Sequence, residues 1–118
     1  MSVKVKRVYE EAAVADGYRV LVDRLWPRGL SRERARLDEW ARALSPEAEL
    51  RRWFGHDPAR FEEFRRRYLR QLAEHEEKLV ELRHRARAGT VTLLYAARDA
   101  EHNNAVVVSE LLRQRTGG

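Results

Sequence analysis

Apolar and polar positions along the chain fall into short blocks that predict strands separated by helical stretches. Val3–Val8 alternates for most of its length, which predicts a strand at a sheet edge because its lysines face one way. Tyr18–Val22 and Val91–Ala96 are nearly continuous apolar runs rich in β-branched residues, so we expect buried strands. Asp16-Gly17 marks a turn before the second of these strands.

Helical spacing is clearest between Asp57 and Ala88. Asp57-Pro58 is a helix start signal, and Gly89 is placed as a C-cap. An apolar stripe at intervals of three and four runs through Phe61, Phe64, Tyr68, Leu72, Leu79, Leu82 and Ala86. The periodicity fits one long helix or two helices with a break near Ala73–His75, and one compact domain favours two.

Weaker helical signals precede this region. Arg32–Arg36 predicts one helical turn, and Leu37, Trp40 and Leu44 then continue at helical spacing. Ser45-Pro46 resembles an N-cap and first helical position, and a short helix ending at Gly55 follows. Its apolar stripe is Leu50, Trp53 and Phe54.

We expect a last helix over Asn103–Arg113 and a frayed tail over about 114–118. The inward side of this helix is predicted to carry Val107, Val108, Leu111 and Leu112. The order of strands and helices predicts an α/β fold, with a mostly parallel sheet and helices packed on its faces. The length of 118 residues fits one small domain spanning 1–118.

The formal net charge is +5, and charged residues make up 36% of the chain. This balance permits an acidic partner such as a nucleotide, a phosphorylated metabolite or nucleic acid. Because 19 acidic residues are interleaved with the 24 basic ones, much of this charge is expected to be a solvated helix surface. Cysteine is absent, no apolar run reaches the length of a membrane span, and we expect a cytoplasmic protein.

The most unusual segment is Asp23–Gly29, which directly follows the second predicted strand. It combines a carboxylate with Arg24, Trp26 and Arg28, and Pro27 and Gly29 shape its backbone. The arginines suit a phosphate or carboxylate, and Trp26 suits stacking on a planar ligand. The structural alternative is that Asp23 pairs with a neighbouring arginine and Trp26 packs under the sheet.

A second polar loop, Ala97–Asn104, follows the last predicted strand and leads into the last helix. The amide groups of that helix start favour an anion, and Arg98 would strengthen the attraction. His102 is the best acid–base candidate because imidazole changes charge near neutral pH. Asp99 could assist it, and Asn103 and Asn104 are candidate ligand contacts, although Asp99 and Asn103 also suit helix capping.

Other constellations are weaker. His56 is a candidate ligand contact, and beside Asp57 it could form a catalytic pair, but Asp57 is explained by capping. Asp99, Glu101 and His102 are poor evidence for a metal, so no metal site is predicted and the cofactor is unknown. Dinucleotide and phosphate-loop fingerprints, a nucleophile elbow and a zinc-protease helix are all absent.

Three motifs occur together in order: Val22–Gly29, Trp53–Pro58 and Thr92–Ala105. With them the chain closely resembles the domain-of-unknown-function 488 family, in its short YeaO-like branch, from about Val3 to Leu112. The resemblance implies a small α/β domain with no settled activity. The recurrent polar residues of the family then fall on Asp23, Arg24, Trp26, Arg28, His56, Asp57, Asp99, His102 and Asn104.

In the wider family that this chain resembles, many members look cysteine-bearing at two places. These are the strand before the last loop and the start of the last helix. This chain has Tyr95 and Asn103 in those regions. A thiol mechanism is therefore excluded here, and one activity shared by the whole family comes into question.

Two loops that each follow a parallel strand are expected to meet at the carboxyl edge of the sheet. The favoured hypothesis is a small anionic ligand held there by Arg24, Arg28 and Arg98. His102 with Asp23 or Asp99 would supply acid–base chemistry if the protein is a hydrolase or transferase. The alternatives are a nucleic-acid-binding protein and a non-catalytic interaction module using Trp26, Trp40 or Trp53, with the oligomeric state unknown.

Overall fold

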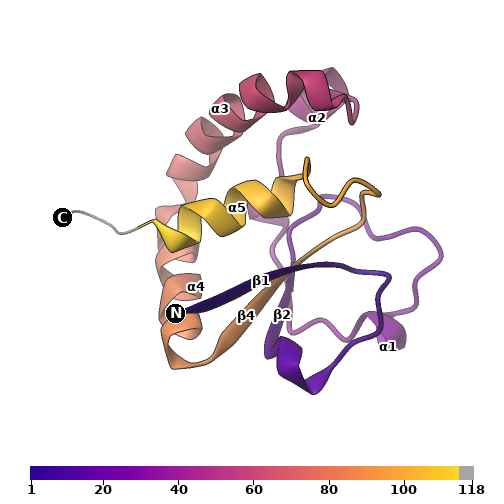
Figure 1. Cartoon of the computed structure of the whole chain (residues 1–118), viewed down its shortest axis with the longest axis vertical. Coiled ribbons are helices and arrows are strands. Elements are labelled where there is room, and N and C mark those ends of the chain that lie inside the picture. Colours follow the sequence, from indigo (N-terminus) through magenta and orange to yellow (C-terminus); the bar gives the residue numbers. More distant parts are fainter. Residues whose placement is uncertain (115–118) are drawn as a thin grey trace.

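Four parallel strands form the sheet of this protein, which is described here from a computed structural model covering residues 1–114 (Figure 1). The strand order is β1 (Ser2–Arg7), β4 (Thr90–Tyr95), β2 (Tyr18–Leu21) and β3 (Glu39–Trp40). In the register of the central strand, Leu93 pairs with Val5 on one side and Val20 on the other. The predicted parallel sheet is confirmed, and so is the edge position of β1.

Alternate residues of the strands supply two cores on opposite faces of the sheet. The larger core contains Val20, Val22 and Leu93 together with side chains from the helices α2, α3, α4 and α5 described below. The smaller one contains Leu21 and Leu94. It is covered by Trp26, Leu30 and Leu37 of the connection between β2 and β3, and by Trp40 of β3. Helices therefore cover one face, and mainly irregular chain covers the other.

The connection after β2 corrects one prediction. The helical turn α1 (Arg32–Ala35) is present, but the helical spacing of Leu37, Trp40 and Leu44 is wrong as an indication of helix. The chain instead forms β3 and a 3₁₀ turn, η2 (Arg42–Leu44). Pairing along the open edge of β2 explains the difference, because the Ala41 amide donates to the Leu21 carbonyl at 2.9 Å.

The helix α2 (Ala48–Phe54) begins later than Ser45-Pro46 predicts. The Ser45 hydroxyl donates to the Arg42 carbonyl at 2.6 Å and closes η2, so it is not available as an N-cap of α2. The helix ends at Gly55 as predicted, with that residue in the left-handed conformation.

A chain of helices with a break runs from Pro58 to Ala88. It comprises η3 (Pro58–Arg60), α3 (Phe61–Leu72), η4 (Ala73–His75) and α4 (Glu76–Ala88). The break therefore lies at the predicted place, and Figure 1 shows the chain bending between α3 and α4. The predicted apolar stripe is buried throughout. Gly89 ends α4 with extended backbone, and its amide donates to the Arg85 carbonyl at 2.9 Å.

The last helix, α5 (Asn104–Arg113), crosses the sheet on the helical face (Figure 1). Val107, Val108 and Leu112 are buried as predicted, whereas Leu111 is half-buried. The predicted frayed tail lies, from residue 115 onward, outside the described residues. Within residues 1–114 no helix is long and apolar enough to span a membrane.

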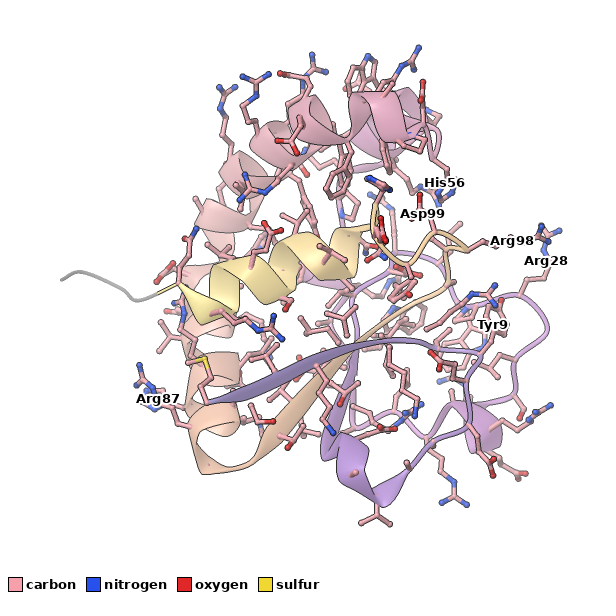
Figure 2. All side chains as sticks on the ribbon, in the orientation of Figure 1. Tyr9, Arg28, His56, Arg87, Arg98 and Asp99 are labelled. Carbon is pink, nitrogen blue, oxygen red and sulfur yellow. The ribbon has the colours of Figure 1, made fainter. Side chains whose placement is uncertain are left out.

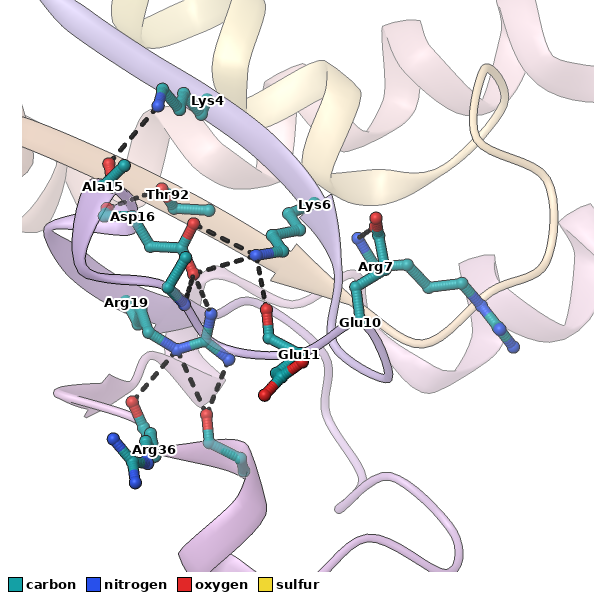
Figure 3. A network of polar contacts seen from close by, with 12 residues as sticks. Lys4, Lys6, Arg7, Glu10, Glu11, Ala15, Asp16, Arg19, Arg36 and Thr92 are labelled. Carbon is teal, nitrogen blue, oxygen red and sulfur yellow. Dashed lines mark hydrogen bonds and ion pairs between the residues drawn. The ribbon is translucent and has the colours of Figure 1, made fainter.

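A buried ion network lies on the face of the sheet opposite the helices (Figure 3). Asp16, in the turn η1 (Val14–Asp16), accepts from Arg19 at 2.5 Å and lies 3.1 Å from Lys6 Nζ. The other guanidinium nitrogens of Arg19 donate to the Ala35 and Arg36 carbonyls. Burial raises the pKa of Asp16, but hydrogen bonds from the Ala13 amide, Lys6 and Arg19 outweigh it and lower the pKa overall.

Candidate functional site

The carboxyl ends of β2 and β4 form a topological switch point. These strands are neighbours, but the chain leaves β2 toward the Trp26 side of the sheet and leaves β4 toward α5 on the helical side. In open parallel sheets a crevice forms where two adjacent connections diverge in this way, and ligands bind there. The loops Asp23–Gly29 and Ala97–Asn104 both lie at this crevice, as expected.

The side chain of Asp23 connects the two diverging connections. Its Oδ2 accepts the Ala96 amide at 2.8 Å, and its Oδ1 accepts Asn104 Nδ2 at 2.9 Å. Asn104 Nδ2 also donates to the Val22 carbonyl at 2.8 Å. Burial raises the pKa of Asp23, opposed by these two hydrogen bonds and by the positive charges of Arg51 and His56. Both carboxylate oxygens are thus engaged by the protein itself.

Aromatic side chains fix the backbone of the Asp23–Gly29 loop. Trp40 Nε1 donates to the Asp23 carbonyl at 2.8 Å, and Trp26 Nε1 donates to the Leu30 carbonyl at 2.7 Å. The two indoles also meet edge to face, with ring centroids 5.4 Å apart, and the Arg32 guanidinium lies 4.9 Å from the Trp26 ring. Trp26 therefore supports the loop. Its contacts fit a tryptophan packed against the protein better than one that stacks on a ligand.

The second loop is organised mainly by its own side chains. The Asp99 carboxylate accepts the Glu101 and His102 amides and lies 2.9 Å from His102 Nδ1. The Glu101 amide is the main cause of the lowered pKa of Asp99, with His102 next. Asn103 caps α5 by accepting the Val106 amide at 3.0 Å.

His102 contacts Asp99 but does not itself line the cleft. Its ring meets Phe61 edge to face with centroids 5.2 Å apart, and it is not part of the cleft lining. Asp23 and Asp99 do line the cleft, so the three acid–base candidates do not converge on one pocket surface.

His56 enters the site through an uncommon backbone conformation. Gly55 and His56 have φ angles of 53° and 57°, so two consecutive residues are left-handed at the end of α2. His56 lines the cleft, whereas Asp57 faces the helix start and accepts the Ala59 amide at 3.0 Å. The neighbouring Asp57 thus acts as a cap, as its position before Pro58 indicates.

These segments enclose an open cleft with a volume of about 1100 Å³. Nine of the candidate residues line it, namely Asp23, Arg24, Trp26, Arg28, His56, Arg98, Asp99, Asn103 and Asn104. Figure 2 shows His56, Arg98, Asp99, Arg28 and Tyr9 on the same side of the molecule, beyond the N-terminal end of α5. The convergence expected for these loops is therefore present.

Sequence reasoning missed Arg7, Tyr9 and Arg51, which also line the cleft. Arg7 ends β1, so the rule that ligands bind at carboxyl strand ends could have identified it and Tyr9. Arg51 lies on the exposed side of α2, and no feature of the sequence sets it apart from the adjacent Arg52.

The cleft is strongly cationic. Its lining contains five arginines, Arg7, Arg24, Arg28, Arg51 and Arg98, against the two carboxylates Asp23 and Asp99. Arg7 Nε donates to the Ala96 and Ala97 carbonyls, and among residues 1–114 the guanidinium groups of the other four have no hydrogen-bond or ion-pair partner. No group of three potential metal ligands occurs in this described part of the chain. The arrangement is chemically suited to an anion.

Fold and cleft together define a small parallel α/β protein with an arginine-lined crevice at the carboxyl edge of its sheet. The chain belongs to the DUF488 family, since the family model described as the inactive DUF488-N3 subclade matches residues 2–117. The family resemblance seen in the sequence is confirmed.

Relatives extend over nearly the whole chain. The uncharacterized protein YeaO of Escherichia coli K12 is 42% identical over 113 residues, covering 96% of this chain and 98% of YeaO. The uncharacterized proteins Mb3100c of Mycobacterium bovis and MT3158 of Mycobacterium tuberculosis are each 41% identical, covering 96% of this chain and 95% of theirs. No solved structure gives a significant match.

Proposed function

We propose that the protein binds a small anionic ligand, a nucleotide or phosphorylated metabolite, in the cleft at the carboxyl edge of the sheet. One observation carries the proposal: the lining has three more formal positive charges than negative ones. Both carboxylates already accept hydrogen bonds from the protein, so they leave the arginines without acidic partners. Unpaired guanidinium groups around a concave surface are suited to phosphate and carboxylate groups.

The proposed role is binding, with hydrolase or transferase chemistry the weaker possibility. An acid–base mechanism through His102 requires its ring to face the reacting groups, but the ring lies against Phe61 and outside the cleft lining. Asp23 connects the ends of β2 and β4 and has no free oxygen. The word inactive in the description of the matching family model agrees with a binding role. The absence of cysteine fits the cytoplasmic setting that we propose.

A small ligand is favoured over nucleic acid because arginines of the helical surface pair with acidic side chains. On α3, Arg66 and Arg67 both pair with Glu63, at 2.6 and 2.7 Å. Arg65 pairs with Glu110 of α5 at 2.7 Å. This mixture of charges is not the continuous basic stripe that nucleic acid requires.

The proposal is tested by thermal-shift and calorimetric titration with inorganic phosphate, pyrophosphate and a panel of nucleotides. We expect stabilisation by at least one of these anions, and we expect Arg28→Gln and Arg51→Gln each to reduce it. Arg52→Gln is the matched control, because Arg52 lies on the same helix, is exposed and does not line the cleft. Equal stabilisation of all variants, or no stabilisation of the unaltered protein, would contradict the proposal.

A further inference from the structure

We infer that the ligand of this cleft carries two anionic groups on one organic body, and that two separate cationic clusters hold them. This inference rests on the proposed function and specifies its ligand class as organic bisphosphates, of which nucleoside bisphosphates are an example. The first cluster is Arg7, Arg28 and Arg98, and the second is Arg51 and His56.

The first cluster is built before any ligand arrives. Arg7 Nε donates to the Ala96 and Ala97 carbonyls at 3.3 and 3.0 Å, and its guanidinium lies 4.8 Å from the Tyr9 ring centroid. Among residues 1–114 the two Nη groups of Arg7 have no acceptor, so they remain available to an anion. The Tyr9 hydroxyl donates to the Arg28 carbonyl at 2.8 Å and fixes the backbone from which Arg28 extends.

Arg98 completes this cluster from the loop after β4. In Figure 2 the side chains of Arg28 and Arg98 extend to the same edge of the molecule, with Tyr9 nearby, and all three line the cleft. The end of β1 and the loops after β2 and β4 thus supply cations to one end of the cleft. Low loss of side-chain entropy is expected at Arg7, because it is already anchored.

The second cluster reaches the cleft from α2, on the helical face of the sheet. Arg51 and His56 line the same cleft as Asp23, and the Arg51 guanidinium acts to lower the pKa of that carboxyl. His56 is held with a φ angle of 57°, a conformation that costs a non-glycine residue of order 1 kcal/mol or more. Such strain is retained mainly at functional positions, and here it places an imidazole in the cleft lining.

The two clusters enter the cleft from different parts of the fold. Arg7 ends β1 and Asp23 follows β2, and β4 lies between these strands, which places their ends about 10 Å apart at two strand spacings. Arg28 and Arg51 also enter from opposite faces of the sheet. The carboxylate of Asp23 disfavours an anion at the middle of the cleft, so the anionic groups are expected at its two ends.

The space between the clusters suits the body of an organic ligand. The lining of the cleft also includes the apolar side chains Leu25, Phe54, Phe64, Ala96 and Ala97. A cleft of about 1100 Å³ is at the upper end of the usual range for small-molecule sites, and larger than one phosphate group needs. Two phosphates joined by a body with an apolar surface would therefore occupy both clusters together.

Isothermal titration calorimetry with adenosine 3′,5′-bisphosphate, adenosine 5′-monophosphate and inorganic phosphate tests this inference. We expect the bisphosphate to bind the unaltered protein at least 10-fold more tightly than the monophosphate. Arg28→Gln and Arg51→Gln should each weaken the bisphosphate about 10-fold. The monophosphate should be weakened by one of these substitutions and unaffected by the other, and Arg52→Gln should change neither affinity.

The outcomes separate this inference from the proposed function. Equal affinity for the bisphosphate and the monophosphate, with phosphate still binding, would overturn the two-cluster inference and leave anion binding intact. A loss of monophosphate affinity in both variants would also overturn the two-cluster inference, because it would mean that both arginines belong to one shared site. Absence of binding by all three compounds would overturn the proposed function and the inference with it. Circular dichroism and thermal unfolding of each variant establish that it is folded.

Discussion

Asn104 Nδ2 lies 2.9 Å from Asp23 Oδ1, although the two residues are 81 positions apart in the sequence. Asp23 follows β2 and Asn104 begins α5, so this hydrogen bond joins the two connections that leave the sheet on opposite faces. It joins the two loops that line the crevice, and the carboxylate that accepts it also accepts the Ala96 amide. The most conspicuous carboxylate of the cleft is thus part of its framework.

Removal of this contact is expected to destabilise the protein. Asp23→Ala deprives the Ala96 amide and the Asn104 side chain of their acceptor, at a cost of about 1–3 kcal/mol in free energy of unfolding. Asn104→Ala should cost about 1 kcal/mol, because it removes the hydrogen bonds that Nδ2 donates to the Val22 carbonyl and to Asp23. Urea unfolding of both single variants and the double variant measures their coupling. Strictly additive losses would show that the hydrogen bond contributes nothing.

Gly17 and Gly29 offer a matched test of backbone strain against packing. Both have positive φ angles, 63° and 76°, so alanine is strained at either position. A Cβ atom at Gly17 would lie 2.3 Å from the Thr90 carbonyl oxygen, whereas nothing lies within 4 Å of one at Gly29. We expect Gly29→Ala to cost about 1 kcal/mol and Gly17→Ala at least twice as much, measured by urea unfolding. Equal losses would contradict the predicted clash.

Trp40→Phe should loosen the Asp23–Gly29 loop. The substitution keeps an aromatic ring beside Trp26 but removes the N–H that donates to the Asp23 carbonyl at 2.8 Å. We expect a loss of about 1 kcal/mol in stability and faster amide hydrogen exchange in the loop. Trp53→Phe is the control, because its indole N–H has no acceptor among residues 1–114 and its ring lies under Arg60 and Arg67. Unchanged exchange in Trp40→Phe would show that the indole does not hold the loop.

Asp16 is expected to make stability depend on acid pH. Its pKa is lowered in the folded protein from an ordinary value of 3.8, so its stabilising contribution is present above that pH. The contribution is lost as pH falls through the folded pKa. Asp16→Asn leaves the buried Arg19 without its acidic partner and should cost about 3 kcal/mol at neutral pH.

The measurement for Asp16 is urea unfolding at several pH values between 7 and 2. The difference between unaltered protein and variant should be constant above pH 5 and shrink below about pH 4. Asp57→Asn, an exposed cap in which asparagine serves equally well, should show little effect at any of these pH values. A difference that grows on acidification would contradict the sign of the predicted shift.

The parts of the fold that can be predicted from the sequence are those set by local patterns of apolar and polar residues. The apolar runs of β2 and β4 need burial on both faces, and the stripe from Phe61 to Ala86 fits only a helix with one buried side. The spacing of Trp40 and Leu44 after Arg36 is compatible with a helix, so the pattern alone gives the wrong secondary structure there. This segment became a strand because the edge of β2 offers hydrogen-bond partners, which no local pattern records.

The candidate site could likewise be predicted only in part from the sequence. Arg24, Arg28 and Arg98 were found because they follow buried strands in loops that packing does not explain. Arg51 was missed because only the packing of α2 brings it to the cleft. The roles within the loops also needed the structure: Trp26 supports the backbone, and His102 lies against Phe61.

The sequence by itself determined that the chain forms a parallel sheet with helices, that two polar loops follow buried strands, and that no thiol chemistry is available. These conclusions depend on periodicity and residue type, which are local. Only the tertiary structure decided that Arg7 and Arg51 join the cleft and that both of its carboxylates are already hydrogen-bonded. The physical reason is that the partners of a charge are set by distances across the fold, and residues far apart in sequence supply them.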